Sequence, residues 1–161
     1  MKRILILLGL CCILTACNNT EVDIQVNTII SDITAEEFSY IAGKNQYGTT
    51  NQKNFQKLTF NFSMEHGSGV NRNIEMFDDW ILLINGYDGL NRYWGGSGGS
   101  RDNDGENFAS YQREFIFYSK GLNDKELKEL FKDARITVEW EANKEKQTKE
   151  IFIADTIIFK E

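Results

Sequence analysis

The sequence predicts a mainly β fold, a single antiparallel β-sandwich with one short α-helix. Several segments alternate apolar and polar residues with a period of two, which is the pattern of a half-buried strand. Other segments are rich in the aromatic and β-branched residues that favour strands. One segment combines helical spacing with a helix-start signal. An immunoglobulin-like sandwich is the predicted architecture, and an α+β fold with the helix packed on one sheet face is the alternative.

The clearest strand signals lie in three alternating segments and one aromatic segment. Residues 58–64 (LTFNFSM) place every second side chain on an apolar face, so that face is expected to lie in the core. Residues 136–141 (ITVEWE) alternate in the same way, and residues 22–26 (VDIQV) open a further strand. Residues 111–118 (YQREFIFY) have the composition of a strand.

Two further segments are predicted to be strands with special features. Residues 79–84 (DWILLI) are apolar on both faces, as in a central strand covered on each side or a strand at a contact surface. Trp80 in this segment is comparable to the core tryptophan of immunoglobulin-like domains, although the disulfide that accompanies it there is missing. Residues 149–159 (KEIFIADTIIF) form the last predicted strand, and Asp155 within it predicts a bulge or an exposed edge.

The one predicted helix spans about residues 123–133. Asn123 can cap its start, and Glu126 three residues later completes a capping box. Leu122, just before the cap, can pack against Leu127 as a hydrophobic staple. Apolar residues then follow helical spacing along one face: Leu127, Leu130, Phe131 and Ala134. We interpret this stripe as part of the core.

The N-terminal segment has the build of a secretory signal. Lys2 and Arg3 form a basic head, and residues 4–14 form an apolar run. The run is too short to span a bilayer as a helix, which takes roughly 20 residues, but it matches the apolar region of a signal peptide. All three cysteines of the chain lie in residues 11–17, at the end of this segment.

The tetrapeptide Leu14-Thr15-Ala16-Cys17 resembles the lipobox of bacterial lipoproteins. The resemblance implies that Cys17 carries a diacylglyceryl group and that residues 1–16 are removed. Two acyl chains give a stable membrane anchor. Residues 17–21 are then the lipidated N-terminus with a short linker, and residues 22–161 are a single β-rich domain. The implied location is the cell membrane or outer envelope, on the extracytoplasmic side.

Charge and cysteine content restrict the mature chain. The sequence has 18 basic and 24 acidic residues. Loss of Lys2 and Arg3 leaves 16 basic against 24 acidic residues, a formal charge of −8. An acidic surface repels nucleic acid, so no nucleic-acid partner is expected. Because the mature region has no cysteine besides Cys17, no intramolecular disulfide can form and the fold must depend on its hydrophobic core.

Three polar segments are predicted to be loops, where a binding site should be sought: residues 43–54, 65–73 and 95–107. Tyr87, Tyr93 and Trp94 lie just before the third segment. Exposed aromatic residues beside glycines can stack on a sugar or anchor a protein partner, whereas packing over the sheet edge is the alternative. We take these three residues as candidate binding residues and expect binding to map to residues 85–107.

Asp102, Asp104 and Glu106 are spaced two apart beside a glycine, as oxygen ligands are in a calcium loop. When the glycine is aligned with that of such a loop, Ser100 and Tyr111 occupy its first and last ligand positions. The terminal bidentate carboxylate is then missing. Calcium binding is therefore one hypothesis, and a solvated acidic loop is the other. No other cofactor is expected.

Catalytic signals are weak in this sequence. His66 is the single histidine, which excludes a zinc site built on several imidazoles. The segment HGSGV lacks the spacing of a serine nucleophile elbow. We therefore expect a membrane-anchored, non-catalytic binding module whose partner is an envelope protein or a glycan. One alternative is an inhibitor or immunity lipoprotein against a toxin or wall-degrading enzyme. Another is a small carboxylate-dependent extracytoplasmic hydrolase.

Overall fold

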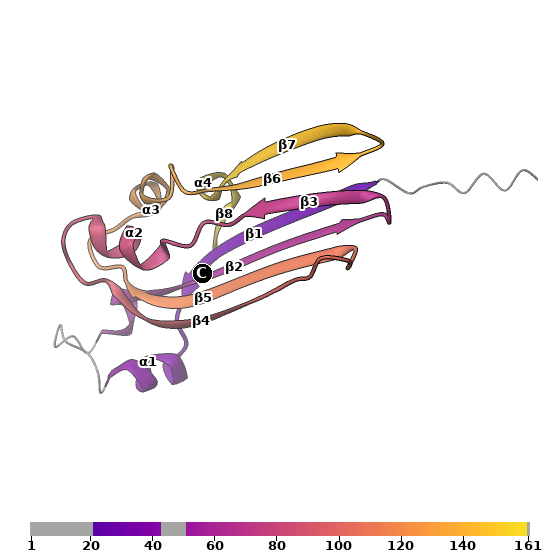
Figure 1. Ribbon diagram of the computed structural model, residues 1–161. Coiled ribbons are helices and arrows are strands. Elements are labelled where there is room, and N and C mark those ends of the chain that lie inside the picture. Colours follow the sequence, from indigo (N-terminus) through magenta and orange to yellow (C-terminus); the bar gives the residue numbers. More distant parts are fainter. Residues whose placement is uncertain (1–20, 43–50, 161) are drawn as a thin grey trace, which may run out of the picture.

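The computed structural model describes residues 21–42 and 51–160, and the strands in them form two sheets (Figure 1). The five-stranded sheet has the spatial order β4 (Tyr93–Asp102), β5 (Phe108–Tyr118), β2 (Phe55–His66), β1 (Val22–Asp32) and β8 (Ile157–Lys160). The three-stranded sheet has the order β3 (Val70–Glu75), β6 (Arg135–Ala142) and β7 (Glu145–Phe152). The predicted mainly β class is confirmed. The prediction that all strands are antiparallel is wrong for one pair, because β8 runs parallel to β1.

Four short helices and a 3₁₀ turn occur in the described residues, where the sequence predicts one helix. They are α1 (Ala35–Ala42), α2 (Trp80–Gly86), α3 (Asp124–Leu130), α4 (Ile153–Thr156) and the 3₁₀ turn Gln52–Asn54. α2, α3 and α4 contribute to the core shared by the two sheets. α1 instead packs against the other face of the five-stranded sheet, in a second and smaller apolar cluster (Figure 1).

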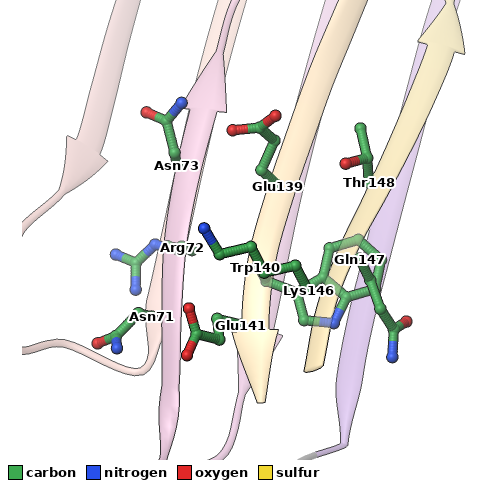
Figure 2. Close-up of a pocket in the computed structure, with 9 residues that line it drawn as sticks. All are labelled: Asn71, Arg72, Asn73, Glu139, Trp140, Glu141, Lys146, Gln147 and Thr148. Carbon is green, nitrogen blue, oxygen red and sulfur yellow. The ribbon is translucent and has the colours of Figure 1, made fainter. Parts of the chain in front are cut away.

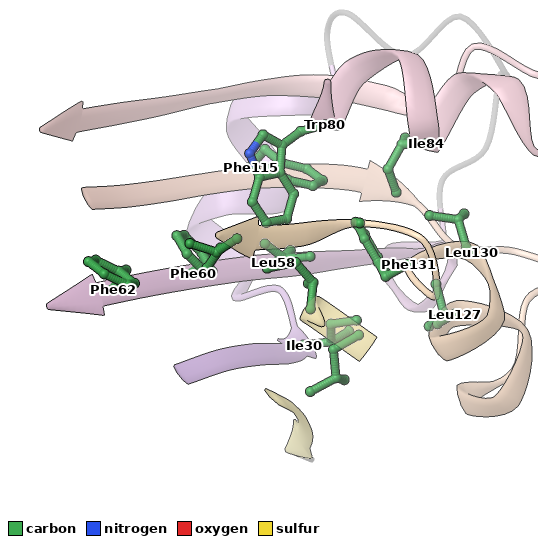
Figure 3. Close-up of a cluster of buried hydrophobic side chains, with 14 of the residues drawn as sticks. Ile30, Leu58, Phe60, Phe62, Trp80, Ile84, Phe115, Leu127, Leu130 and Phe131 are labelled. Carbon is green, nitrogen blue, oxygen red and sulfur yellow. The ribbon is translucent and has the colours of Figure 1, made fainter. Parts of the chain in front are cut away.

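One hydrophobic core joins the two sheets and three of the helices. Alternate side chains of β2 and β5 point into it, and β6 contributes Ile136 and Val138 from the smaller sheet. Trp80 of α2 lies above Phe115, close to the start of its helix (Figure 3). Because both sheets contribute to one apolar cluster, the arrangement is sandwich-like.

β2 confirms the strand predicted from the alternation of residues 58–64. The apolar positions are at most 2% exposed, and the polar residues between them are half-buried. β2 pairs with β1 along one edge and with β5 along the other. This central position explains why its inner face carries four large, fully buried side chains of the core: Leu58, Phe60, Phe62 and Met64.

α3 confirms the predicted helix start. The Asn123 side chain accepts hydrogen bonds from the backbone amides of Lys125 and Glu126, at 3.0 and 3.1 Å. The Glu126 carboxylate accepts one from the Asn123 amide at 2.8 Å, which completes the capping box. The helix ends at Leu130, before the predicted end at 133. The predicted apolar stripe is buried throughout.

Residues 79–84 begin a helix, so the predicted central strand is wrong. α2 buries Trp80 and Ile84, one helical turn apart, while Leu82 is 71% exposed. A short unbroken apolar run has no period that would distinguish strand from helix. Its tertiary position decides the outcome, because a helix lets Trp80 and Ile84 enter the same core together.

Most of the predicted loop at 95–107 is also strand. β4 pairs with β5 as far as Asp102, and only residues 103–107 connect the two strands. A Cβ at Gly96 would lie 2.1 Å from the carbonyl oxygen of Glu114. The glycine is therefore required because β4 approaches β5 closely.

The other predicted connections also differ from expectation. Within residues 65–73, only three residues separate β2 from β3. Residues 43–50 of the predicted loop at 43–54 lie outside the described residues. The predicted strand at 149–159 is divided by α4, so Asp155 lies in a helical turn and not in a bulge.

The predicted signal segment, the lipobox and the linker as far as residue 20 lie outside the described residues. Glu21 precedes β1, and its carbonyl oxygen accepts a hydrogen bond from the amide of Gly67 in the β2–β3 turn at 3.3 Å. The N-terminal strand therefore starts beside that turn. In the part of the chain that the structure describes, no helix has the length and apolar character needed to cross a bilayer.

Candidate functional site

The aromatic cavity is a hollow of about 340 Å³ between the five-stranded sheet and the segment leading from β3 to α2. Residues of β4 and β5 form its floor, and residues 76–80 cover it. A hollow of this size that combines aromatic side chains with polar groups is a candidate ligand site. Its principal lining residues are Phe60, Phe77, Asp78, Trp80, Gly98, Gly99, Tyr111 and Arg113.

Three packed rings form the apolar wall of the aromatic cavity. The ring centroid of Trp80 lies 5.2 Å from that of Phe60 and 5.2 Å from that of Phe77. Phe60 reaches this wall because alternation along β2 directs it to the inner face of the sheet. Trp80 and Phe60 are at most 3% exposed, so the surrounding core holds them in place.

Glycines keep the aromatic cavity open. A Cβ at Gly98 would lie 2.9 Å from the carbonyl oxygen of Gln112 and 3.1 Å from Nη1 of Arg113. A larger residue at Gly98 would therefore force a shift. A Cβ at Gly99 would meet nothing within 4 Å. The missing side chain of Gly98 thus leaves space on the cavity side of β4, and that of Gly99 leaves space on the opposite face.

Arg113 and Asp78 line the aromatic cavity without an ion-pair partner among the described residues. Arg113 is half-buried, and its guanidinium lies against the position of Gly98. Asp78 is exposed just before α2. A partly desolvated guanidinium presents several donors in a fixed plane, which suits a carboxylate or phosphate group. The cavity therefore has an anion-binding group directed at its glycine floor.

Tyr111 adds an oriented phenol to the aromatic cavity. Its hydroxyl donates a hydrogen bond to Oδ2 of Asp102 at 2.6 Å. Burial, together with this hydrogen bond to a carboxylate, raises the pKa of Tyr111. The phenol therefore stays protonated at neutral pH and serves as a positioned ring and not as a base.

A second hollow, of about 300 Å³, crosses the three-stranded sheet (Figure 2). Glu139 and Glu141 of β6 line it, with Asn71 and Asn73 of β3 on one side and Lys146 of β7 on the other. It is more open to solvent than the aromatic cavity, so it desolvates a ligand less. It brings two carboxylates to one strand, and the predicted carboxylate-dependent hydrolysis can be tested there.

The three candidate aromatic residues do not share one surface. Tyr87 is 42% exposed after α2. Tyr93 packs on the core side of β4, with its ring centroid 5.6 Å from that of Phe115. Trp94 packs on the opposite face, 5.9 Å from Phe55 in the cluster that α1 completes. Consecutive strand residues face opposite sides, which explains the separation. Their role in binding stays a prediction.

The three candidate calcium ligands are engaged differently. Oδ1 of Asp102 accepts a hydrogen bond from Nη2 of Arg72 at 2.6 Å. Glu106 pairs with Arg101 at 2.9 Å, and this hydrogen bond lowers the pKa of Glu106. Asp104 is exposed in the β4–β5 turn. Among the described residues, no group of three or more histidine, cysteine or acidic side chains could hold a metal ion. Calcium binding stays a prediction.

The Arg72 network joins the β4–β5 turn to the three-stranded sheet. Besides Asp102, the guanidinium donates to the backbone carbonyl oxygens of Glu106 at 2.7 Å and Phe108 at 3.1 Å. Its Nη1 also lies 2.5 Å from Nε2 of His66. The Arg72 side chain is only 8% exposed. Because these contacts occupy the guanidinium donors with acceptors of the protein itself, we interpret the network as structural.

The sequence did not identify the side chains that define the aromatic cavity. Phe60 and Trp80 were assigned to the core, and Tyr111 and Arg113 to an ordinary strand. They come from three separate elements, so no local spacing unites them. The available signal was the glycine run, because glycine within a strand marks a bulge or a close approach. That run falls inside residues 85–107, the region predicted to bind.

Comparison with known proteins gives no assignment: no protein-family model matches this sequence, and neither does any curated protein. A fold by itself does not determine function. The geometry of the aromatic cavity is therefore the basis for inferring function.

Proposed function

We propose that this chain is a lipid-anchored extracytoplasmic lipoprotein whose β-domain is a non-catalytic binding module. Its ligand site is the aromatic cavity. The observation that carries the proposal is the position of Arg113, a half-buried cation without an ion-pair partner in the described residues, beside a rigid aromatic wall. Aromatic walls supply contact area, and a single charged group fixes the orientation of the ligand.

The chemistry of the cavity defines the ligand class. A ligand with an apolar group and an anionic group would place the first against Trp80 and the second beside Arg113. An envelope protein or a glycan can carry both groups. The formal charge of −6 of the whole chain disfavours a strongly acidic partner, so we propose a single local anionic group.

The proposed lipid anchor makes a direct prediction. Cys17→Ala should remove the lipid attachment point, so the protein should leave the membrane fraction or accumulate as an unprocessed precursor. Metabolic labelling with a palmitate analogue should mark the wild type only. Cys12→Ala is the matched control, because this residue lies inside the removed segment and its loss should leave labelling unchanged. A Cys17→Ala protein that stays labelled and membrane-bound would show that the lipobox assignment is wrong.

The proposed binding site can be tested by substitution of its cation. Arg113→Gln should weaken capture of the partner from cross-linked intact membranes by about tenfold or more, as expected for loss of a charged hydrogen bond. The melting temperature should change little, because no ion pair is broken. Arg135→Gln is the control for charge, since Arg135 is exposed and lies in a different sheet.

The outcomes of this capture experiment discriminate between sites. Equal capture by wild type and by Arg113→Gln would contradict the aromatic cavity as the binding site. Loss of capture with Glu139→Gln, while Arg113→Gln binds normally, would move the site to the hollow of the three-stranded sheet. If a substrate accumulates in cells that carry the Glu139→Gln or the Glu141→Gln variant, the hydrolase alternative is favoured.

We also propose that the sandwich is immunoglobulin-like in architecture. Its support is the packing of two sheets of mostly antiparallel strands over one core. The parallel pairing of β1 with β8 and the placement of Trp80 on a helix are departures from the usual pattern.

A further inference from the structure

We propose that the exposed edge of β4 binds an extended segment of a partner protein, which joins the five-stranded sheet as an additional strand. This inference rests on the proposed binding function and specifies how the partner is held. The added strand would lie along Gly95–Ser100 and direct an apolar side chain into the aromatic cavity. Strand addition of this kind takes affinity from backbone hydrogen bonds and specificity from pockets for alternate side chains.

Between Gly95 and Ser100, β4 lacks the charged residues and prolines that usually protect a sheet edge, and its bulge lies before this stretch, between Tyr93 and Gly95. Among the described strands it pairs only with β5. Its residues 95–100 are all glycine or serine, and all are exposed. Natural edges are commonly protected by charged residues, prolines, bulges or short length. β7, an edge of the other sheet, carries four charged residues in its eight positions, and β8 has only four residues. β3, the remaining edge of the three-stranded sheet, has charged residues at two of its six positions. Residues 95–100 of β4 are therefore the edge most open to pairing.

Hollows lie on both faces of β4 at the same position. The aromatic cavity lies on the inner face, and a polar hollow of about 350 Å³ lies on the outer face. Gly98 and Gly99 line both. Side chains of an added strand alternate between the two faces. A segment with alternating apolar and polar residues therefore matches the aromatic inner hollow and an outer hollow lined by Thr59, Asn61, Ser97, Gln112 and Glu114.

Arg113 specifies the charge of the segment. It lines both hollows and has no ion-pair partner among the described residues. An acidic residue of the partner, close to its apolar anchor, would supply the missing carboxylate. The occupant is therefore an extended segment of alternating apolar and polar residues with one acidic residue.

A second copy of this chain fits the edge less well. Between Gly95 and Ser100, β4 has no side chain larger than serine. Pairing of two β4 strands would therefore leave the aromatic cavities unfilled, and unfilled apolar space weakens an interface. A partner segment with a large apolar side chain fills this space.

The test uses the full-length lipoprotein in detergent micelles as bait for a phage-displayed library of random peptides. Enriched peptides should show two-residue alternation with an acidic residue, and a synthetic copy of the best one should bind the wild type. Gly99→Lys should weaken the binding of that peptide by about tenfold or more, because it places a charged side chain on the outer face of the edge at which the added strand would pair. Thr148→Lys adds the same charge to β7 and should leave binding unchanged. Binding should also slow amide hydrogen exchange in residues 95–100 of the wild type.

Several results would overturn strand addition. These are an absence of enriched peptides, enriched peptides with helical periodicity, and equal binding of the best peptide to Gly99→Lys. Gly99→Lys should fold normally because a Cβ there meets nothing within 4 Å, and an unchanged melting temperature checks this. A dimer in sedimentation that Gly99→Lys dissociates would identify a second copy as the occupant instead.

The membrane capture experiment separates this inference from the proposed function. Normal capture by Gly99→Lys with loss of capture by Arg113→Gln would retain the aromatic cavity as the binding site and contradict strand addition. Normal capture by both variants would contradict both. Loss of capture by both variants supports both.

Discussion

Replacing Arg72 by methionine is expected to lower the free energy of unfolding by about 3–5 kcal/mol. The nearly buried guanidinium donates to the Asp102 carboxylate and to three backbone carbonyl oxygens. Methionine has a similar length but no donor. The Asp102 carboxylate would keep only the Tyr111 hydroxyl among its donors, and the carbonyl oxygens would lose the guanidinium in a partly buried location, which is costly. Chemical denaturation of wild type and variant measures the difference.

Arg135→Met is the matched control for this prediction. Arg135 also lies in the three-stranded sheet, but its ion pair with Glu150 is long, at 3.5 Å, and both side chains are at least half exposed. Exposed pairs contribute about 0–1 kcal/mol, so this variant should be nearly as stable as the wild type. Arg72→Lys should recover only part of the loss, because an ammonium group cannot reproduce the planar set of donors. Equal stability of Arg72→Met and Arg135→Met would contradict the structural role of the network.

Trp80→Ala is expected to lower the free energy of unfolding by about 3–5 kcal/mol. Trp80 is 3% exposed, and its ring packs within 6.1 Å, between centroids, of four phenylalanine rings: Phe60, Phe77, Phe115 and Phe131. Truncation removes most of that contact and leaves a void that the rigid neighbours cannot fill. It would also remove one wall of the aromatic cavity, so the affinity for the ligand should fall together with the free energy of unfolding.

Tyr87→Ala and Trp80→Phe are the comparisons for this second prediction. Tyr87 is 42% exposed, so its truncation should change stability by about 0.5 kcal/mol or less. Trp80→Phe keeps an aromatic ring in place, so it should lower the free energy of unfolding less than Trp80→Ala does. If Trp80→Ala unfolds at the same denaturant concentration as Tyr87→Ala, then α2 does not hold the core as described.

The strands that could be predicted are those whose side chains show burial on one face only. In β2 the alternation at residues 58–64 directly reflects the core on one side and partial solvent exposure on the other. The capping box at Asn123 was also predictable, because its two hydrogen bonds depend on residues three positions apart. Signals of this kind are local, and the sequence contains them in full.

The elements that could not be predicted depend on distant contacts. Residues 79–84 have no distinguishing period, and their helix is selected by packing against rings from β2 and β5. In β4, glycines indicate a loop by propensity, but the close approach of Gly96 to the β5 backbone makes them part of a strand. The aromatic cavity combines both cases. Its wall includes Trp80 of the unexpected helix, and its floor includes the glycines of the unexpected strand.

The parallel pairing of β8 with β1 has a consequence for how the domain forms. Residues Thr28–Ser31 lie beside Ile157–Lys160, and the hydroxyl oxygens of Thr28 and Thr156 are 2.7 Å apart. If the chain is exported as proposed and is translocated from its N-terminus, the β8 segment emerges after all the other described strands. The five-stranded sheet therefore cannot be completed during translocation, and β1 keeps an unpaired edge until residue 160 has emerged. Pairing over so long a separation in sequence is slow. In the proposed export, such a delay would leave the domain open at β1 until the β8 segment has crossed the membrane.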